Sequence, residues 1–150
     1  MKNEPRILII EDDDVLRAML FTILRHQPVS VDTAASADEA LRRVTKCDYA
    51  LIVVDVDMPD QAGERFLAIF REQRPEATSF VLAVRDPRNE TPLGPELVSA
   101  ILNKPLEIDM LGELVRECAL VVPPPDEPLP CPQSESELRS RLEHGSPIAN

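Results

Sequence analysis

The sequence predicts an α/β domain built on a five-stranded parallel sheet, followed by a proline-rich tail. Over residues 5–122, short apolar runs alternate with segments whose apolar residues recur at helical spacing. Strict alternation of this kind implies crossover connections, which give a parallel sheet with helices on both faces. The composition changes after Val122, because residues 123–150 hold seven of the fifteen prolines.

Five runs have the length and composition of strands. The third is entirely apolar, which is typical of a strand that helices cover on both faces. The expected strands are residues 6–10, 29–34, 49–54, 79–84 and 100–102. Five strands in about 120 residues suit the flavodoxin-like doubly wound fold, whose strand order is 2-1-3-4-5.

Apolar stripes predict helices after the first, second, third and fifth strands, and Ser36 is a plausible N-cap of the second helix. The link between the fourth and fifth strands is different, because it contains Pro87, Pro92 and Pro95. A proline inside a helix costs about 3 kcal/mol or more. We therefore expect the fourth helix to be short, distorted or absent.

Composition excludes several functions. The net charge of −11 argues against binding to nucleic acid or anionic membranes, although a basic protein partner remains compatible. The three cysteines form no CxxC motif, so we expect neither a disulfide framework nor a zinc site, and a reducing compartment fits. No apolar run approaches the roughly 20 residues of a transmembrane helix. These features predict a cytoplasmic location.

The proline-rich stretch cannot build a core of its own. We therefore expect one domain over residues 1–122 and a flexible, disordered tail over residues 123–150. Ser134 and Glu137 have capping-box spacing, so a short helix could form within the tail.

Charged residues follow three strands of the predicted sheet at the point where each strand ends. Glu11 and Asp12 follow the first strand, Asp55 and Asp57 follow the third, and Lys104 follows the fifth. In this fold ligands bind beyond the carboxyl ends of the strands, between the first and third. We expect these residues to line one crevice.

Clustered carboxylates are unfavourable without a counter-cation. Oxygen ligands in an open crevice suit magnesium, which uses one or two carboxylates together with phosphate oxygens. A carboxylate nucleophile, a metal and an ammonium group are the parts that can form and hold an aspartyl phosphate.

Four segments together resemble response-regulator receiver domains over residues 5–122. They are ILIIEDDDVLR, VVDVDMPDQAG, LAVRD and NKP, in the order and spacing of the family pattern. The resemblance implies that Asp55 is the phosphoacceptor and that Lys104 contacts the phosphoryl group. It also implies a magnesium site in which Asp12 and Asp55 bind directly, Glu11 binds through water and Asp57 offers its backbone carbonyl.

Two positions depart from the family pattern. Receivers usually carry Thr or Ser at the end of the fourth strand, where the register here gives Ala83, or Val84 or Arg85 after a slip of one or two residues. Receivers also carry Tyr or Phe three residues before the lysine, where this chain has Ile101. The acceptor chemistry looks intact, whereas the readout looks altered.

Three functions follow as hypotheses. The first is a module that accepts a phosphoryl group on Asp55 from a histidine kinase or phosphotransfer protein and signals through a downstream protein contact. The second is a pseudo-receiver that binds its partner regardless of phosphorylation, which Ala83 and Ile101 favour. The third, a magnesium-dependent phosphohydrolase, has weak support from the DVD segment at Asp55 and Asp57 and lacks a cap domain.

Overall fold

The computed structural model describes residues 4–121 of the chain, and the tail with its possible helix at Ser134 lies outside the described residues. In chain order the elements are β1 (Arg6–Ile10), α1 (Asp14–Leu24), β2 (Ser30–Ala34), α2 (Ala37–Lys46), β3 (Leu51–Asp55), the 3-10 helix η1 (Pro59–Gln61), α3 (Ala62–Gln73), β4 (Phe80–Arg85), β5 (Ala100–Asn103) and α4 (Ile108–Val121).

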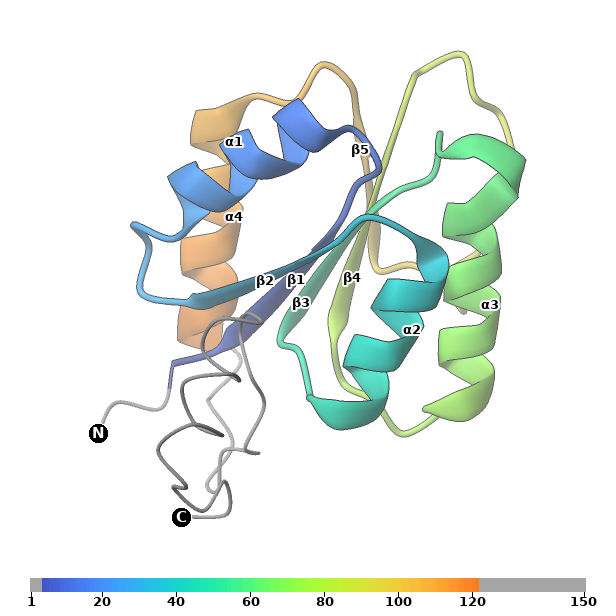
Figure 1. The fold of residues 1–150 in the computed structure, drawn as a ribbon, viewed down its shortest axis with the longest axis horizontal. Coiled ribbons are helices and arrows are strands. Elements are labelled where there is room, and N and C mark those ends of the chain that lie inside the picture. Colours follow the sequence, from blue (N-terminus) through green and yellow to red (C-terminus); the bar gives the residue numbers. More distant parts are fainter. Residues whose placement is uncertain (1–3, 122–150) are drawn as a thin grey trace.

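The five strands form one parallel sheet in the order β2-β1-β3-β4-β5, which confirms the predicted fold. Helices α1 and α4 cover one face of the sheet and α2 and α3 cover the other (Figure 1). Each predicted strand lies within two residues of its observed bounds. The prediction succeeded because a doubly covered sheet requires apolar runs that differ visibly from the helical stripes.

Alternate residues of the strands enter two aliphatic clusters, one on each face of the sheet. Ile7 and Ile9 belong to one cluster, and Leu8 and Ile10 belong to the other. All five residues of β3 are buried, since this strand lies at the centre of the sheet with helices on both sides. The core is thus continuous up to Asp55, the last residue of β3.

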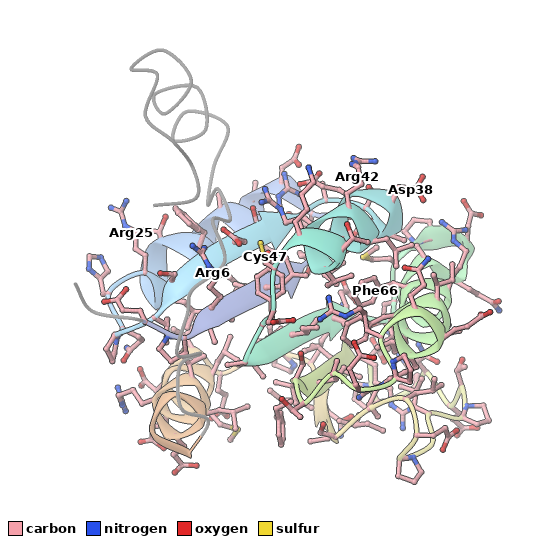
Figure 2. All side chains as sticks on the ribbon, turned by 90° about the horizontal axis from the view of Figure 1, so that it is seen from below. Arg6, Arg25, Asp38, Arg42, Cys47 and Phe66 are labelled. Carbon is pink, nitrogen blue, oxygen red and sulfur yellow. The ribbon has the colours of Figure 1, made fainter. Side chains whose placement is uncertain are left out.

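Polar residues determine where the first two helices begin. The Asp13 side chain accepts hydrogen bonds from the backbone N–H groups of Val15 and Leu16, and Ser36 accepts one from Glu39 N–H. The predicted N-cap at Ser36 is confirmed. Asp38 and Arg42 point away from the sheet on the outer face of α2 (Figure 2).

Residues 86–99 connect β4 to β5 without a helix, as the prolines predicted. The label α4 therefore belongs to the helix that follows β5. Leu93 and Leu97 of the connection pack against the cluster on the α2 and α3 face, so the segment still covers part of the core.

One expectation about the cysteines was wrong. Cys47 is buried, as a small core residue would be, but it is disulfide-bonded. Spacing alone could not reveal this bond, because cysteines far apart in sequence pair only when the fold brings them together. Within residues 4–121, every helix is too short or too polar to serve as a transmembrane segment.

Candidate phosphoacceptor site

The site forms because β1 and β3 are parallel neighbours. Their register pairs Ile10 with Val54, so the residues that follow each strand emerge at the same edge of the sheet. Glu11 and Asp12 follow β1, and Asp55 ends β3. The strand order reverses between these two strands, which is where a ligand crevice forms in this fold.

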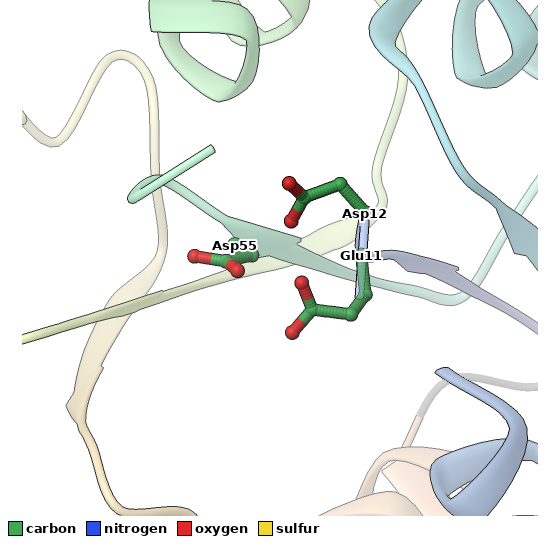
Figure 3. Close-up of side chains that lie close together, drawn as sticks. All are labelled: Glu11, Asp12 and Asp55. Carbon is green, nitrogen blue, oxygen red and sulfur yellow. The ribbon is translucent and has the colours of Figure 1, made fainter. Parts of the chain in front are cut away.

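Three carboxylates converge at this edge. One oxygen from each of Glu11, Asp12 and Asp55 lies within 4.8 Å of the other two. Glu11 and Asp55 are buried, whereas Asp12 is exposed and forms the solvent side of the group (Figure 3). The three side chains that the sequence assigned to a metal site are therefore gathered in one place.

The group is electrostatically costly for Glu11. The pKa of the Glu11 carboxyl is raised to about 8, chiefly by burial and in addition by the adjacent Asp55 and Asp12 carboxyls, which favour the protonated form. A hydrogen bond from the backbone of Asp13 partly opposes the increase. A divalent cation placed among these oxygens would offset the repulsion among the carboxylates and so favour the charged form of Glu11.

Lys104 brings positive charge to the other side of Asp55. Its Nζ lies 3.0 Å from Asp55 Oδ1 and 3.1 Å from Asp57 Oδ2. Burial lowers the pKa of Lys104, but hydrogen bonds to the two carboxylates outweigh this and raise it. Asp55 Oδ1 also accepts a hydrogen bond from Asp57 N–H at 2.8 Å, so this oxygen is fixed from two directions.

The side chain of Asp57 has a role that the sequence did not indicate. Its Oδ2 accepts a hydrogen bond from Asp86 N–H at 2.7 Å, and its Oδ1 accepts one from Asn89 Nδ2 at 2.8 Å. Burial raises the pKa of Asp57, yet the bonds from Asn89, Asp86 and Lys104 lower it overall. The sequence offers only one indication that Asp86 and Asn89 belong to the site, which is that both are polar and follow the fourth strand closely.

Gly63 allows α3 to begin close to the acceptor loop. A Cβ atom at this position would lie 2.7 Å from the Asp55 carbonyl oxygen and 3.0 Å from Val56 Cα. Asp60 and Gln61, just before α3, adopt positive φ values of 58° and 54°. The absence of a side chain at Gly63 therefore allows the close approach of the backbone around Asp55.

The register of β4 against β3 shows where each of the three residues lies that could occupy the Thr or Ser position of receivers. Ala83 is fully buried opposite Val54, while Val84 lies opposite Asp55 and Arg85 ends the strand. None of the residues in β4 or β5 carries a hydroxyl group. Ile101 lies opposite Ala83 on β5 and is 39% exposed.

The donor set fits magnesium. Carboxylate oxygens are the ligands this hard cation prefers, and an exposed acid beside two buried acids leaves room for the waters it retains.

This fold and this acidic site define a class of protein, and the comparison with family models agrees. Residues 7–116 match the response regulator receiver domain, so the chain belongs to that family. Receiver domains of this family are modules of two-component signalling, generally without enzymatic turnover, and bind Mg2+ in an acidic pocket.

Curated relatives are regulators of the same class. The chain is 29% identical over 112 residues to the transcriptional regulatory protein PmrA of Pectobacterium parmentieri, covering 74% of this chain and 50% of the relative. It is 32% identical over 114 residues to the transcriptional regulatory protein PrrA of Mycobacterium leprae, covering 75% and 48%. The chain thus spans about half the length of these relatives.

Solved structures agree on the fold. The receiver domain of the Francisella response regulator 1452 matches with a TM-score of 0.67 and 24% identity, covering 77% of this chain and 97% of that one. A sensor protein from Polaromonas sp. JS666 matches with a TM-score of 0.65 and 31% identity, covering 77% and 95%. The Thermotoga maritima response regulator TrrA, solved in complex with Mg(2+)-BeF, has a TM-score of 0.65 and 23% identity, with coverage of 76% and 98%.

Proposed function

We propose that Asp55 accepts a phosphoryl group from the phosphohistidine of a histidine kinase or a phosphotransfer protein. An oxygen of Asp55 attacks phosphorus, the bond between phosphorus and the imidazole nitrogen breaks, and the electron pair stays with the imidazole. The product is an aspartyl phosphate on Asp55, and no phosphate ester is turned over.

One observation carries the proposal. The Asp55 carboxylate lies between the Lys104 ammonium, 3.0 Å from its Oδ1, and the carboxylates of Glu11 and Asp12. Lys104 supports the transfer because its charge can stabilise the negative oxygens of the incoming group. Asp57 N–H orients the nucleophile through its bond to Asp55 Oδ1.

Magnesium completes the proposed chemistry. Asp12 and Asp55 would hold the cation directly, Glu11 through water and Asp57 through its backbone carbonyl. When bound, the cation would neutralise phosphoryl oxygens and offset the repulsion among the carboxylates. Asp12 faces solvent, so the cation and the donor can enter from the same side.

The acceptor test uses acetyl phosphate, Mg2+ and intact-mass spectrometry. We expect the mass of one phosphoryl group to be added to the wild type and to be absent from Asp55→Asn or after chelation of Mg2+. Asp60→Asn is the matched control, because it makes the same chemical change on an exposed acid and asparagine tolerates the positive φ at that position. Labelling of Asp55→Asn at the wild-type level would refute the assignment.

A second candidate is the pseudo-receiver, which binds its partner in the same way with and without phosphorylation. The lack of hydroxyl groups in β4 and β5 and the lack of a helix in residues 86–99 favour it. Equal affinity of a captured partner for unmodified and phosphorylated protein would support this candidate over the first.

The same proposal extends to the binding partners, the domain organisation and the cellular location of the protein. We propose a protein as the downstream partner and no direct contact with nucleic acid or membrane, because the chain carries a net charge of −11. We also propose a receiver domain over residues 1–122, and the expected tail of residues 123–150 lies outside the described residues. A cytoplasmic location stays a prediction for cell fractionation to test, and the disulfide at Cys47 counts against it.

A further inference from the structure

The Asp57 carboxylate links the acceptor pocket to the connection between β4 and β5. On the pocket side, Asp57 Oδ2 lies 3.1 Å from Lys104 Nζ. On the other side, the same carboxylate accepts hydrogen bonds from Asp86 N–H and Asn89 Nδ2. Asp57 therefore shares one ammonium group with Asp55 while it holds a turn that lies about 30 residues further along the chain.

The turn that Asp57 holds is ordered by its own hydrogen bonds. Asn89 N–H donates to the Asp86 carbonyl at 2.9 Å, and Asn89 Oδ1 accepts from Thr91 N–H at 3.1 Å. Arg85 Nη1 donates to the Thr91 carbonyl at 2.9 Å. A displacement of the turn would therefore reach Thr91 and the segment beyond it.

The segment beyond the turn packs Leu93, Leu97 and Val98 against the cluster on the α2 and α3 face, and part of its hydrogen bonding lies within the segment itself. The Leu97 and Val98 N–H groups both donate to the Gly94 carbonyl, and Arg71 Nε donates to the Leu97 carbonyl. The segment contains no helix that would resist a change in its first residues. A displacement of the Asp57 side chain can therefore change the conformation of this segment.

We infer that Asp57 is the positioning residue that couples the occupancy of Asp55 to the conformation of residues 86–99. Because β4 and β5 carry no hydroxyl group, Asp57 would take over the transmission of the phosphorylation state from Asp55 to the surface segment. The inference rests on the proposed function, since it assumes that Asp55 receives a phosphoryl group.

Charge explains the direction of the coupling. Phosphorylation replaces the single charge of the Asp55 carboxylate with the roughly two charges of a phosphoryl group near neutral pH. The Lys104 ammonium is attracted more strongly to this doubly charged group than to Asp57, so Lys104 moves toward the phosphoryl oxygens. Asp57 then loses its cationic partner and is repelled by the new charge. Its carboxylate keeps the neutral donors of Asp86 and Asn89 and moves away with them.

Hydrogen exchange with beryllofluoride and Mg2+ as the phosphoryl mimic tests this inference. The reporters are the Leu97 and Val98 amides, which do not contact the pocket charges in any hydrogen bond of the described residues. In the wild type we expect these amides to exchange about fivefold faster or more when beryllofluoride is bound, the lower end of typical coupling between sites. Intact-mass measurement with acetyl phosphate accompanies the experiment.

Asn89→Asp is the decisive variant. The new carboxylate can still accept the Thr91 N–H bond but cannot donate to Asp57, so the turn keeps its own bond, loses the side-chain link to Asp57 and retains only the backbone link from Asp86 N–H. The new negative charge also repels the Asp57 carboxylate. We expect beryllofluoride to change exchange at Leu97 and Val98 by less than a third of the wild-type effect. Arg88→Gln is the matched control, because Arg88 contacts Asp86 side-chain oxygens and not Asp57, and it should respond as the wild type does.

The outcomes separate the two proposals. If the wild type gains a phosphoryl group while Leu97 and Val98 do not respond to beryllofluoride, the coupling is refuted and the acceptor function stands. An equal response in Asn89→Asp and the wild type also refutes it. If no phosphoryl group is added, the acceptor function itself fails.

Discussion

At the ends of β1 and β3 the chain gathers carboxylates, whereas β4 and β5 carry no hydroxyl group and pair the apolar residues Ala83 and Ile101. The first region brings Glu11, Asp12 and Asp55 within 4.8 Å of one another. In the second, Ala83 is buried and Ile101 is half-exposed, and Lys104 N–H donates to the Arg85 carbonyl at 2.8 Å.

The two regions differ in the kind of change to which they respond. Buried carboxylates respond strongly to a cation or a phosphoryl group, since their energy depends on nearby charge. Apolar strands respond only through packing, which is short-ranged. A chain that retains the first region and lacks hydroxyl groups in the second can keep its chemistry while it transmits the result by another route. The following predictions test this contrast, beginning with the largest expected effect.

Glu11→Gln should reveal the cost of the charged region. The folded pKa of Glu11 is about 8 and its ordinary value is 4.5, so the folded state binds the proton more tightly. The contribution of this proton to the free energy of unfolding is fully present below about pH 4.5 and is lost as the pH rises to about 8. We expect metal-free wild type to lose on the order of 3 kcal/mol relative to Glu11→Gln across this range. Urea unfolding at several pH values measures the difference.

Two controls accompany that measurement. Glu72→Gln makes the same change on an exposed residue of α3 and should leave the pH dependence of unfolding as in the wild type. Saturating Mg2+ should flatten the wild-type dependence, because a bound cation favours the charged carboxylate. A wild type and a Glu11→Gln variant with parallel pH profiles would show that the pocket carries no such cost.

Lys104→Met should slow phosphorylation by acetyl phosphate about a hundredfold, the usual effect of removing one group that stabilises developing charge. The physical reason is the loss of the ammonium group 3.0 Å from Asp55 Oδ1. Initial rates from intact-mass spectra measure the effect. Lys46→Met, at the end of α2, should phosphorylate at the wild-type rate, and a similar rate in both variants would separate Lys104 from the chemistry.

Gly63→Ala should destabilise the protein by about 2 kcal/mol, because a Cβ atom would overlap the Asp55 carbonyl oxygen and force the backbone apart. Gly112→Ala is the matched control. Its Cβ atom would lie 3.6 Å from Gln27 Nε2, an ordinary contact, and alanine favours a helix by up to about 1 kcal/mol. Thermal unfolding should therefore shift in opposite directions, and two shifts of the same sign would contradict the close approach at Gly63.

The parts of the molecule that depend on local pattern could be predicted from the sequence. The apolar run before Asp55 predicted a central strand, Ser36 predicted a helix start, and three prolines predicted a fourth helix that is short, distorted or absent. Contacts between distant turns could not be predicted, because they depend on the path of residues 86–89 in space. For this reason the sequence assigned Asp57 only a backbone role, and its bonds to Asp86 and Asn89 were missed.

The smallest expected effect comes from restoring a hydroxyl group to β4. The sequence left three positions open, and the register places Ala83 beside Val54 in the core, one residue short of Asp55. Ala83→Thr should cost about 1.5 kcal/mol, since it adds volume and a polar group to a packed apolar cluster, and it should leave the lifetime of the phosphoryl group unchanged.

Arg85→Thr should behave in the opposite way. It removes the hydrogen bond from Arg85 to the Thr91 carbonyl, a loss of about 1 kcal/mol, and places a hydroxyl at the end of β4, beyond the residue that pairs with Asp55. We expect the phosphoryl lifetime to change in this variant, as followed by intact mass after removal of acetyl phosphate. A changed lifetime in Ala83→Thr with no change in Arg85→Thr would place the missing hydroxyl at position 83, two residues earlier in the strand than position 85.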